Sequence, residues 1–196
     1  MIVFLDRHHH GKPHSWDDMG ASRDLDGNGL TSIRENESIL TGFYILHAEI
    51  RLRELGHSVC VLSDGRYSDR HARVNQYAGN DSVYVACHVN AGATASGYGS
   101  VFFDFRTSSG NVLAADICTE LARLPELDQK VKTIEAGAAD WTRNAYNTIK
   151  NVNCHAVCFE PFFIDSDRHR ALTSDSGLKS VGVALADGIH RYFQRR

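Results

Sequence analysis

Three short apolar segments of this chain each end in side chains that could bind a metal ion or transfer a proton. The first runs into His8, His9 and His10, the second into His88, and the third into Glu160. Two histidines and a carboxylate, with one coordination position left for water, are typical protein ligands of a catalytic zinc ion. The three segment ends therefore indicate the active site of a metal-dependent hydrolase.

The segments that carry these residues have the length and composition of buried β-strands, and helical patterns lie between them. Apolar residues recur at helical spacing in Ile39, Phe43, Leu46 and Ile50, which predicts one face of a helix that ends before Gly56. Alternating strands and helices predict an α/β fold of three layers, a mostly parallel twisted sheet with helices on both faces. In such a sheet the carboxyl ends of the strands share one edge, where ligands bind. The predicted strands cover residues 2–6, 58–63, 83–88, 101–105 and 156–160, and the predicted helices cover about 37–55, 68–77, 112–124 and 178–193.

The composition is that of a soluble globular protein with a proper core. The chain has 196 residues, 42% of them hydrophobic, and a formal net charge of −3, which does not favour non-specific nucleic-acid binding. Among its five cysteines, Cys60, Cys87 and Cys158 fall in predicted strands, where a thiol acts as a small core residue. No apolar run approaches the roughly 18 residues of a membrane span, and no basic-then-apolar leader opens the chain. We expect one monomeric domain over residues 1–196, made in the cytoplasm without a signal peptide and with no stable membrane insertion.

The third ligand of a zinc site with His9 and His88 should be a carboxylate. The best-placed one is Glu37, at the start of the first predicted helix, and Glu35 lies two residues before it. A lone histidine at a strand end is most often a hydrogen-bonded polar residue, and a lone glutamate in a first helical turn usually interacts with the helix dipole. Only the combination of several such strand ends favours the metal ligands.

The order of the motifs resembles that of the zinc-dependent N-acetylmuramoyl-L-alanine amidases of amidase type 3. Residues 5–11 (LDRHHHG) resemble the family's Asp-Pro-Gly-His-Gly-Gly-like turn, and residues 86–91 (ACHVNA) resemble its Ser-x-His-x-Asn-Ala strand end. Residues 157–164 (VCFEPFFI) resemble its Val-Leu-Val-Glu-x-x-Phe-Ile run, and the likeness extends over residues 2–193. Smaller matches are Asp18-Met19-Gly20-Ala21 and the pair of Arg70 and Asn75; the departures are His8 and His10, where the family has small residues, and Ser63-Asp64, where it has Thr-Arg.

The resemblance implies a site and a reaction. It implies His9, Glu37 and His88 as zinc ligands and Glu160 as the catalytic base and acid. The bond expected to break is the amide between N-acetylmuramic acid and L-alanine of the stem peptide in peptidoglycan. The compact chain resembles a phage endolysin, which acts on the bacterial cell wall during lysis.

A calcium loop is predicted inside this domain. Residues 24–35 (DLDGNGLTSIRE) fit the twelve-residue EF-hand loop, with a glycine at position six and a glutamate at position twelve. A polar, glycine-rich surface turn is the alternative interpretation. If Glu35 binds calcium, Glu37 is left for zinc. The predicted calcium ligands are Asp24, Asp26, Asn28, the backbone carbonyl of Leu30, and Glu35, with Ser32 acting directly or through water.

Three other functions compete with the wall amidase. A zinc amidohydrolase or carboxypeptidase acting on small N-acyl amino acids would use the same zinc chemistry, since a fold does not fix a substrate. A non-catalytic wall-binding module would have no need of Glu160. A calcium-binding structural protein would leave His9, His88 and Glu160 unexplained. A covalent mechanism is not favoured, because Cys87, the thiol beside His88, lies in an apolar strand.

Overall fold

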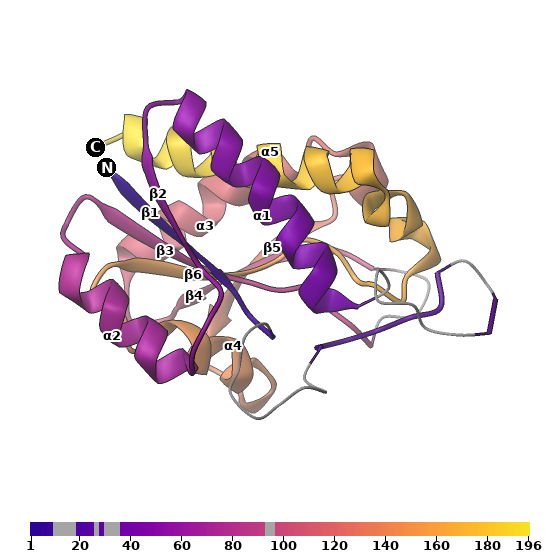
Figure 1. Ribbon diagram of the computed structural model, residues 1–196, viewed down its shortest axis with the longest axis horizontal. Coiled ribbons are helices and arrows are strands. Elements are labelled where there is room, and N and C mark those ends of the chain that lie inside the picture. The colour runs from indigo at the N-terminus through magenta and orange to yellow at the C-terminus, as the bar shows by residue number, and fades with distance from the viewer. Residues whose placement is uncertain (10–18, 26–27, 30–35, 93–96) are drawn as a thin grey trace.

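The structure is a computed structural model that describes residues 1–9, 19–25, 28–29, 36–92 and 97–196. A six-stranded sheet forms the centre of this part of the chain (Figure 1). The order of the strands across the sheet is β2-β1-β3-β6-β4-β5. The strands are β1 (Ile2–Arg7), β2 (Ser58–Leu62), β3 (Ser82–Cys87), β4 (Gly99–Asp104), β5 (Val131–Ala136) and β6 (His155–Glu160).

The sheet is mostly parallel, as the alternation of strands and helices predicts. β1 pairs in parallel with β2 and β3, β3 pairs in parallel with β6, and β4 pairs in parallel with β5. The pairing between β4 and β6 is antiparallel, so β4 and β5 run opposite to the other strands. The neighbours β1, β3 and β6 therefore end at the same edge of the sheet, and these are the strands that carry the histidines and Glu160.

Helices cover both faces of the sheet, which confirms the predicted three layers. α1, α3 and α5 lie on one face, and α2 and α4 lie on the other (Figure 1). None of the helices within the described residues combines the length and apolar character that crossing a bilayer requires. The helices are α1 (Glu37–Glu54), α2 (Tyr67–Tyr77), α3 (Ser108–Leu121), α4 (Arg143–Ile149) and α5 (Asp175–Gln194), with short 3₁₀ turns at Pro125–Leu127, Asp140–Thr142 and Asp167–Thr173.

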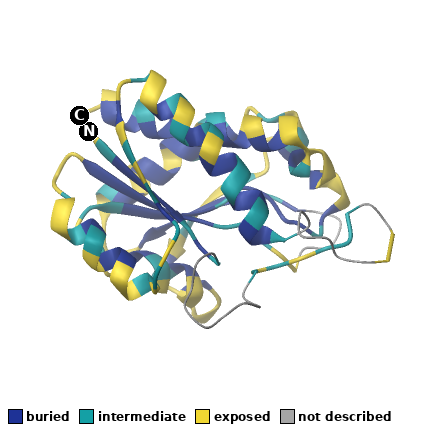
Figure 2. Cartoon of the chain, in the orientation of Figure 1, coloured by how far each residue is buried: buried dark blue, intermediate teal, exposed yellow. Residues whose placement is uncertain are grey.

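The central strands divide their side chains between two cores, because successive residues of a strand point to opposite faces. Val85 and Cys87 of β3 pack with α1, α3 and α5, while Tyr84 and Ala86 pack with α2 and α4. The sheet and the inner helix faces are buried, as Figure 2 shows. Burial raises the pKa of the Cys87 thiol well above its usual value, so this residue remains an uncharged core thiol.

Two expectations from the sequence are wrong in detail, and two elements were not predicted. Cys60 is exposed, because it lies on the edge strand β2 and not in the core. The α1 helix is present, but its buried side chains include Leu40, Tyr44 and Leu52. Leu46 and Ile50, which the periodicity places on the apolar face, are about half exposed, at 50% and 48%. β5 and α4 were not predicted, since β5 has three exposed polar residues that do not alternate with apolar ones and α4 buries only two side chains, Ala145 and Ile149.

Candidate functional site

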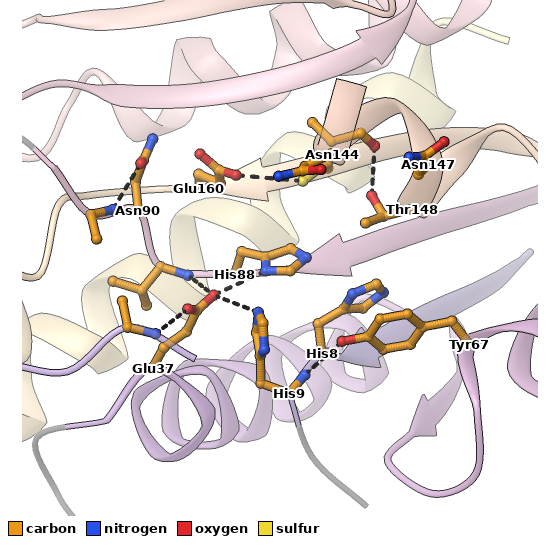
Figure 3. Close-up of a pocket in the computed structure, with 15 residues that line it drawn as sticks. His8, His9, Glu37, Tyr67, His88, Asn90, Asn144, Asn147, Thr148 and Glu160 are labelled. Atoms are coloured by element: carbon orange, nitrogen blue, oxygen red, sulfur yellow. Dashed lines mark hydrogen bonds and ion pairs between the residues drawn. The ribbon is translucent and has the colours of Figure 1, made fainter. Parts of the chain in front are cut away.

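Three neighbouring strands bring the sequence-predicted residues to one place. The chain leaves β1 at Arg7 and turns through His8 and His9, His88 directly follows β3, and Glu160 is the last residue of β6. The register pairs Cys87 with Arg7 on one side and with Phe159 on the other. The side chains of His9, His88 and Glu160 therefore border the same cavity at the carboxyl edge of these strands (Figure 3).

Glu37 reaches this edge from the first residue of α1 and is almost fully buried. Its Oε1 atom lies 2.9 Å from Nδ1 of His88 and 3.7 Å from Nε2 of His9. The same oxygen accepts a hydrogen bond from the backbone N–H of Val89 at 3.0 Å, and Oε2 accepts one from the N–H of Ala21 at 2.8 Å. These donors hold the carboxylate in one orientation, pointing at the two imidazoles.

His9, Glu37 and His88 form a cluster that suits a metal ion. One nitrogen or oxygen atom from each lies within 4.8 Å of the others. Nε2 of His88 is buried and has no hydrogen-bond partner among the described residues. The atoms that face one another in the cluster are Nδ1 of His88, Oε1 of Glu37 and Nε2 of His9, so a metal ion bound there would take Nδ1 of His88 and leave its Nε2 to another group. Two imidazoles and one carboxylate are a donor set that fits zinc, with a fourth position left open.

The protonation of this cluster follows from its ion pair. Burial alone lowers the pKa of His88, but its hydrogen bond to Glu37 and the charge of that carboxylate outweigh burial and raise the pKa. Burial alone raises the pKa of Glu37, and its interactions with His88 and then His9 reverse this and lower the pKa. A proton is therefore shared between His88 and Glu37. A metal ion would compete with this proton for the two side chains, since metal ligation needs a neutral imidazole.

The segment around Gly20 shapes the Glu37 side chain. Gly20 has a φ of +73°, and a Cβ atom added there would lie 2.8 Å from Cδ of Glu37 and overlap its Oε2 atom. Next to it, Ala21 donates its N–H to Glu37, and Glu37 donates its own backbone N–H to the carbonyl of Ala21 at 2.7 Å. Gly20 and Ala21, which match the family motif, thus hold the Glu37 side chain in place.

Gly20→Ala should weaken metal binding more than backbone strain alone can explain. The added methyl group would push the Glu37 carboxylate out of its orientation, and loss of such a supporting contact typically costs about 10–100-fold in metal affinity. Gly56→Ala is the matched control, because Gly56 also has a positive φ, +84°, and a Cβ atom added there would meet no atom within 4 Å. Metal affinity from competition with a chelator checks the prediction. Equal affinities for the two variants would contradict it.

His9 occupies its place through a left-handed backbone turn. Its φ is +58°, and its backbone N–H donates to the hydroxyl of Tyr67 at 3.1 Å. The ring of His8 stacks on the Tyr67 ring with centroids 4.0 Å apart. His8 is fully buried, with Nε2 3.4 Å from Oδ2 of Asp6, and although its ring lies 4.5 Å from that of His88 and borders the cavity, it is not a member of the cluster. Of the three histidines, His9 joins Glu37 and His88, and His10 lies outside the described residues.

A buried network beneath the site explains the match at Arg70. Nη1 of Arg70 donates to Asp6 at 2.6 Å and to the carbonyl of Arg7 at 2.9 Å, and the Tyr84 hydroxyl donates to Asp6 at 2.7 Å. Burial alone raises the pKa of Asp6, but these partners and His8 lower it to about 2. A fully paired buried carboxylate and guanidinium fix the end of β1, from which the histidines emerge.

Glu160 borders the cavity, whose volume is about 410 Å³, with the cluster. Burial raises the pKa of its carboxyl group; the charge of Glu37 adds to this effect, and His88 and the Cys158 thiol oppose it. A carboxyl group with a raised pKa is a better base and acid near neutral pH than an ordinary one. The far wall contains Asn144, Asn147 and Thr148 of α4. The sequence analysis missed these three residues, because α4 itself was not predicted.

The predicted calcium loop is described only in part. Asp24 and Asn28 lie within the described residues, and Asp26, Leu30, Ser32 and Glu35 lie outside them. The backbone N–H of Gly29 donates to Oδ2 of Asp24 at 2.8 Å, and Gly29 has a φ of +83°. Such a turn occurs in EF-hand loops and also in ordinary polar turns, so calcium binding stays a prediction.

An α/β domain that brings two histidines and a glutamate together at the carboxyl edge of parallel strands has a ligand set typical of metal-dependent hydrolases. The chain belongs to the N-acetylmuramoyl-L-alanine amidase family, Amidase_3, whose family model matches residues 9–191. The family resemblance drawn from the sequence is thereby confirmed. Family membership indicates a hydrolase of the cell wall, a peptidoglycan amidase.

Solved structures share this fold at low sequence identity. Cwp6 from Clostridium difficile matches with a TM-score of 0.80 and 19% identity over 97% of this chain, which spans 29% of the Cwp6 chain. The amidase AmiC2 of Nostoc punctiforme matches with a TM-score of 0.77 and 17% identity over 100% of this chain and 98% of its own. The catalytic domain of CwlV from Bacillus (Paenibacillus) polymyxa matches with a TM-score of 0.75 and 19% identity over 100% of this chain and 99% of the CwlV chain. No curated protein sequence matches the chain.

Proposed function

We propose that this protein is a zinc-dependent N-acetylmuramoyl-L-alanine amidase that cleaves the amide between N-acetylmuramic acid and L-alanine in peptidoglycan. One observation carries the proposal. The cluster of His9, Glu37 and His88 borders the same cavity as Glu160, a carboxyl group whose pKa is raised by burial. These are a metal-binding group and a proton carrier, which together suit hydrolysis of an unactivated amide.

In the proposed mechanism the chain's own residues hold the metal and move the proton. A zinc ion bound by His9, Glu37 and His88 would supply a Lewis acid that polarises the scissile carbonyl and makes water more acidic. Glu160 takes a proton from the attacking water at its carboxylate and then delivers that proton to the nitrogen of the departing L-alanine. The backbone N–H groups of Ala21 and Val89 keep the Glu37 carboxylate in place throughout.

Fragments released from purified peptidoglycan test the proposed reaction. The zinc-loaded protein should release stem peptides that begin with a free L-alanine amine and leave the glycan strands uncut, as mass spectrometry would show. Cut glycan strands, or peptides cut within the stem, would assign a different hydrolase. Intact peptidoglycan together with hydrolysis of small N-acyl amino acids would favour the amidohydrolase alternative.

We also propose that the protein acts as a monomer in lysis, because its compact chain resembles a phage endolysin. Removing stem peptides from glycan strands removes the cross-links that give the wall its strength. The lytic role is tested by the fall in turbidity of a wall suspension, and the oligomeric state by light scattering. A stable dimer would contradict the monomeric state, and full amidase activity without loss of turbidity would contradict the lytic role.

Calcium is proposed as a second, structural ion. The support is the twelve-residue match over 24–35, together with the hydrogen bond between Gly29 and Asp24. The loop precedes Glu37 directly, so an ordered loop would help to fix the start of α1.

Calcium should therefore raise the melting temperature of the wild-type protein and leave that of Asp24→Ala unchanged, because Asp24 is the predicted first ligand. Asp140→Ala is the control, since Asp140 is an exposed carboxylate outside the loop. Calorimetric titration of the metal-chelated, zinc-reconstituted protein measures the binding. Calcium binding with equal strength by the wild type and Asp24→Ala would eliminate this site.

A further inference from the structure

The wall of the cavity opposite the metal-ligand cluster is made by α4. Asn144, Asn147 and Thr148 line the cavity from this side. Figure 3 shows them across the cavity from His9 and Glu37. A substrate held between the two sides would thus contact α4 while its scissile bond lies by the cluster and Glu160.

The two asparagine side chains on this wall are available to a ligand. They lie three residues apart on α4, so they share one face of the helix. Both are exposed, and within the described residues neither side-chain amide has a hydrogen-bond partner. Thr148 differs, because its hydroxyl donates to the carbonyl of Ala145 at 2.7 Å. Each amide offers two N–H donors and one oxygen acceptor, which suits hydroxyl and acetamido groups.

An exposed tryptophan stands beside these amides. Trp141 is in the 3₁₀ turn that leads into α4 and is 67% exposed. Its ring and that of Phe102 of β4 pack edge to face, with ring centroids 6.3 Å apart. Phe102 lies opposite Cys158 in the sheet register, and Cys158 lines the cavity. Trp141 is not one of the residues that line the cavity; it lies on the β4 side of α4, where it packs on Phe102 and presents an exposed aromatic surface.

The residues that line the α4 side of the cavity are uncharged, which favours a sugar as the group bound there. Among the described lining residues there is no lysine or arginine, and the α4 residues Asn144, Asn147 and Thr148 are neutral. A stem peptide carries carboxylates, which arginine or lysine would normally bind. A glycan offers neutral hydroxyl and acetamido groups, and its ring faces carry C–H groups that pack on indole.

We propose that Trp141, Asn144 and Asn147 form a glycan subsite. Asn144 and Asn147 hydrogen bond with the acetamido and hydroxyl groups of the N-acetylmuramic acid whose amide is cleaved. Trp141 packs against the face of the adjoining sugar ring. The inference rests on the proposed function, because that function places the muramyl amide at Glu160. The subsite adds the direction in which the glycan leaves the site, over α4 toward β4.

Binding of a product-like ligand tests the subsite without requiring hydrolysis. The ligand is a peptide-free tetrasaccharide of alternating N-acetylglucosamine and N-acetylmuramic acid, titrated by calorimetry into the zinc-loaded full chain. We expect Trp141→Ala and the Asn144→Ala/Asn147→Ala double variant each to raise the Kd about 10-fold, as the loss of one or two ordinary contacts does. Asn111→Ala and Tyr77→Ala, which remove an exposed amide and an exposed aromatic ring elsewhere, should leave it unchanged. Equal melting temperatures would show that all four variants are folded.

The outcomes separate this inference from the proposed function. If the wild-type protein cleaves peptidoglycan but the Trp141 and asparagine variants bind the tetrasaccharide as tightly as the controls do, the subsite is wrong and the amidase stands. If the tetrasaccharide binds through these residues but no amide is cleaved, the subsite stands and the amidase is wrong. If the wild-type protein neither cleaves peptidoglycan nor binds the tetrasaccharide, both are overturned.

Discussion

Glu160→Gln should lower kcat on peptidoglycan by about 10²–10⁴-fold, the usual contribution of a general acid–base group, with an unchanged zinc content. Glutamine keeps the size of the side chain but cannot take up the proton of the attacking water. Glu160 belongs to the cavity, whereas the cluster of possible metal ligands consists of His9, Glu37 and His88. The measurements are initial rates of stem-peptide release and zinc content by mass spectrometry.

Two further results bear on the role of Glu160. Glu135→Gln is the matched control, since Glu135 is an exposed glutamate on the edge strand β5, and it should leave kcat unchanged. If Glu160→Gln lost zinc together with activity, Glu160 would be a metal ligand. If it kept full activity with full zinc content, another group would have to carry the proton.

Much of the fold could be predicted because the central strands are strongly apolar. β3 is buried at every position, and such a segment bounded by turns is recognisable in a sequence. β5 could not be recognised, because Lys132, Thr133 and Glu135 are exposed on it, which a strand at the edge of a sheet permits. The face of α1 could not be chosen either, because apolar residues surround much of this helix and packing against α5 and the sheet selects Leu40, Tyr44 and Leu52.

The candidate site could be predicted as far as its residues lie at strand ends or at a helix start. Sequence order alone cannot say which of His8, His9 and His10 joins Glu37 and His88, because the backbone turn at His9 and the stacking of His8 on Tyr67 decide it. The α4 wall was missed for a different reason. A short helix with few buried side chains has almost no periodic pattern, so its position over the cavity follows only from the folded chain.

Glu37→Gln should abolish tight zinc binding and, with it, amidase activity. A neutral amide is a poor zinc ligand, and the Glu37 carboxylate also lies 2.9 Å from Nδ1 of His88, so the change weakens two members of the cluster. Losing a group that only supports a ligand costs about 10–100-fold in metal affinity, so losing a ligand should cost more. Glu54→Gln, at the exposed end of the same helix, is the control.

Thermal unfolding measures this loss independently of activity. A metal that binds only the folded state stabilises it by about 2.7 kcal/mol at a concentration 100 times its Kd. For a domain of this size that corresponds to a rise in Tm of roughly 5–10 °C, which wild type and Glu54→Gln should show and Glu37→Gln should not. An equal rise in all three proteins would place the zinc ion away from Glu37, and activity surviving in zinc-free Glu37→Gln would remove zinc from the proposed reaction. The combination of no zinc-dependent rise, no activity and an unchanged Tm without metal would assign Glu37 to the metal and not to the stability of the fold.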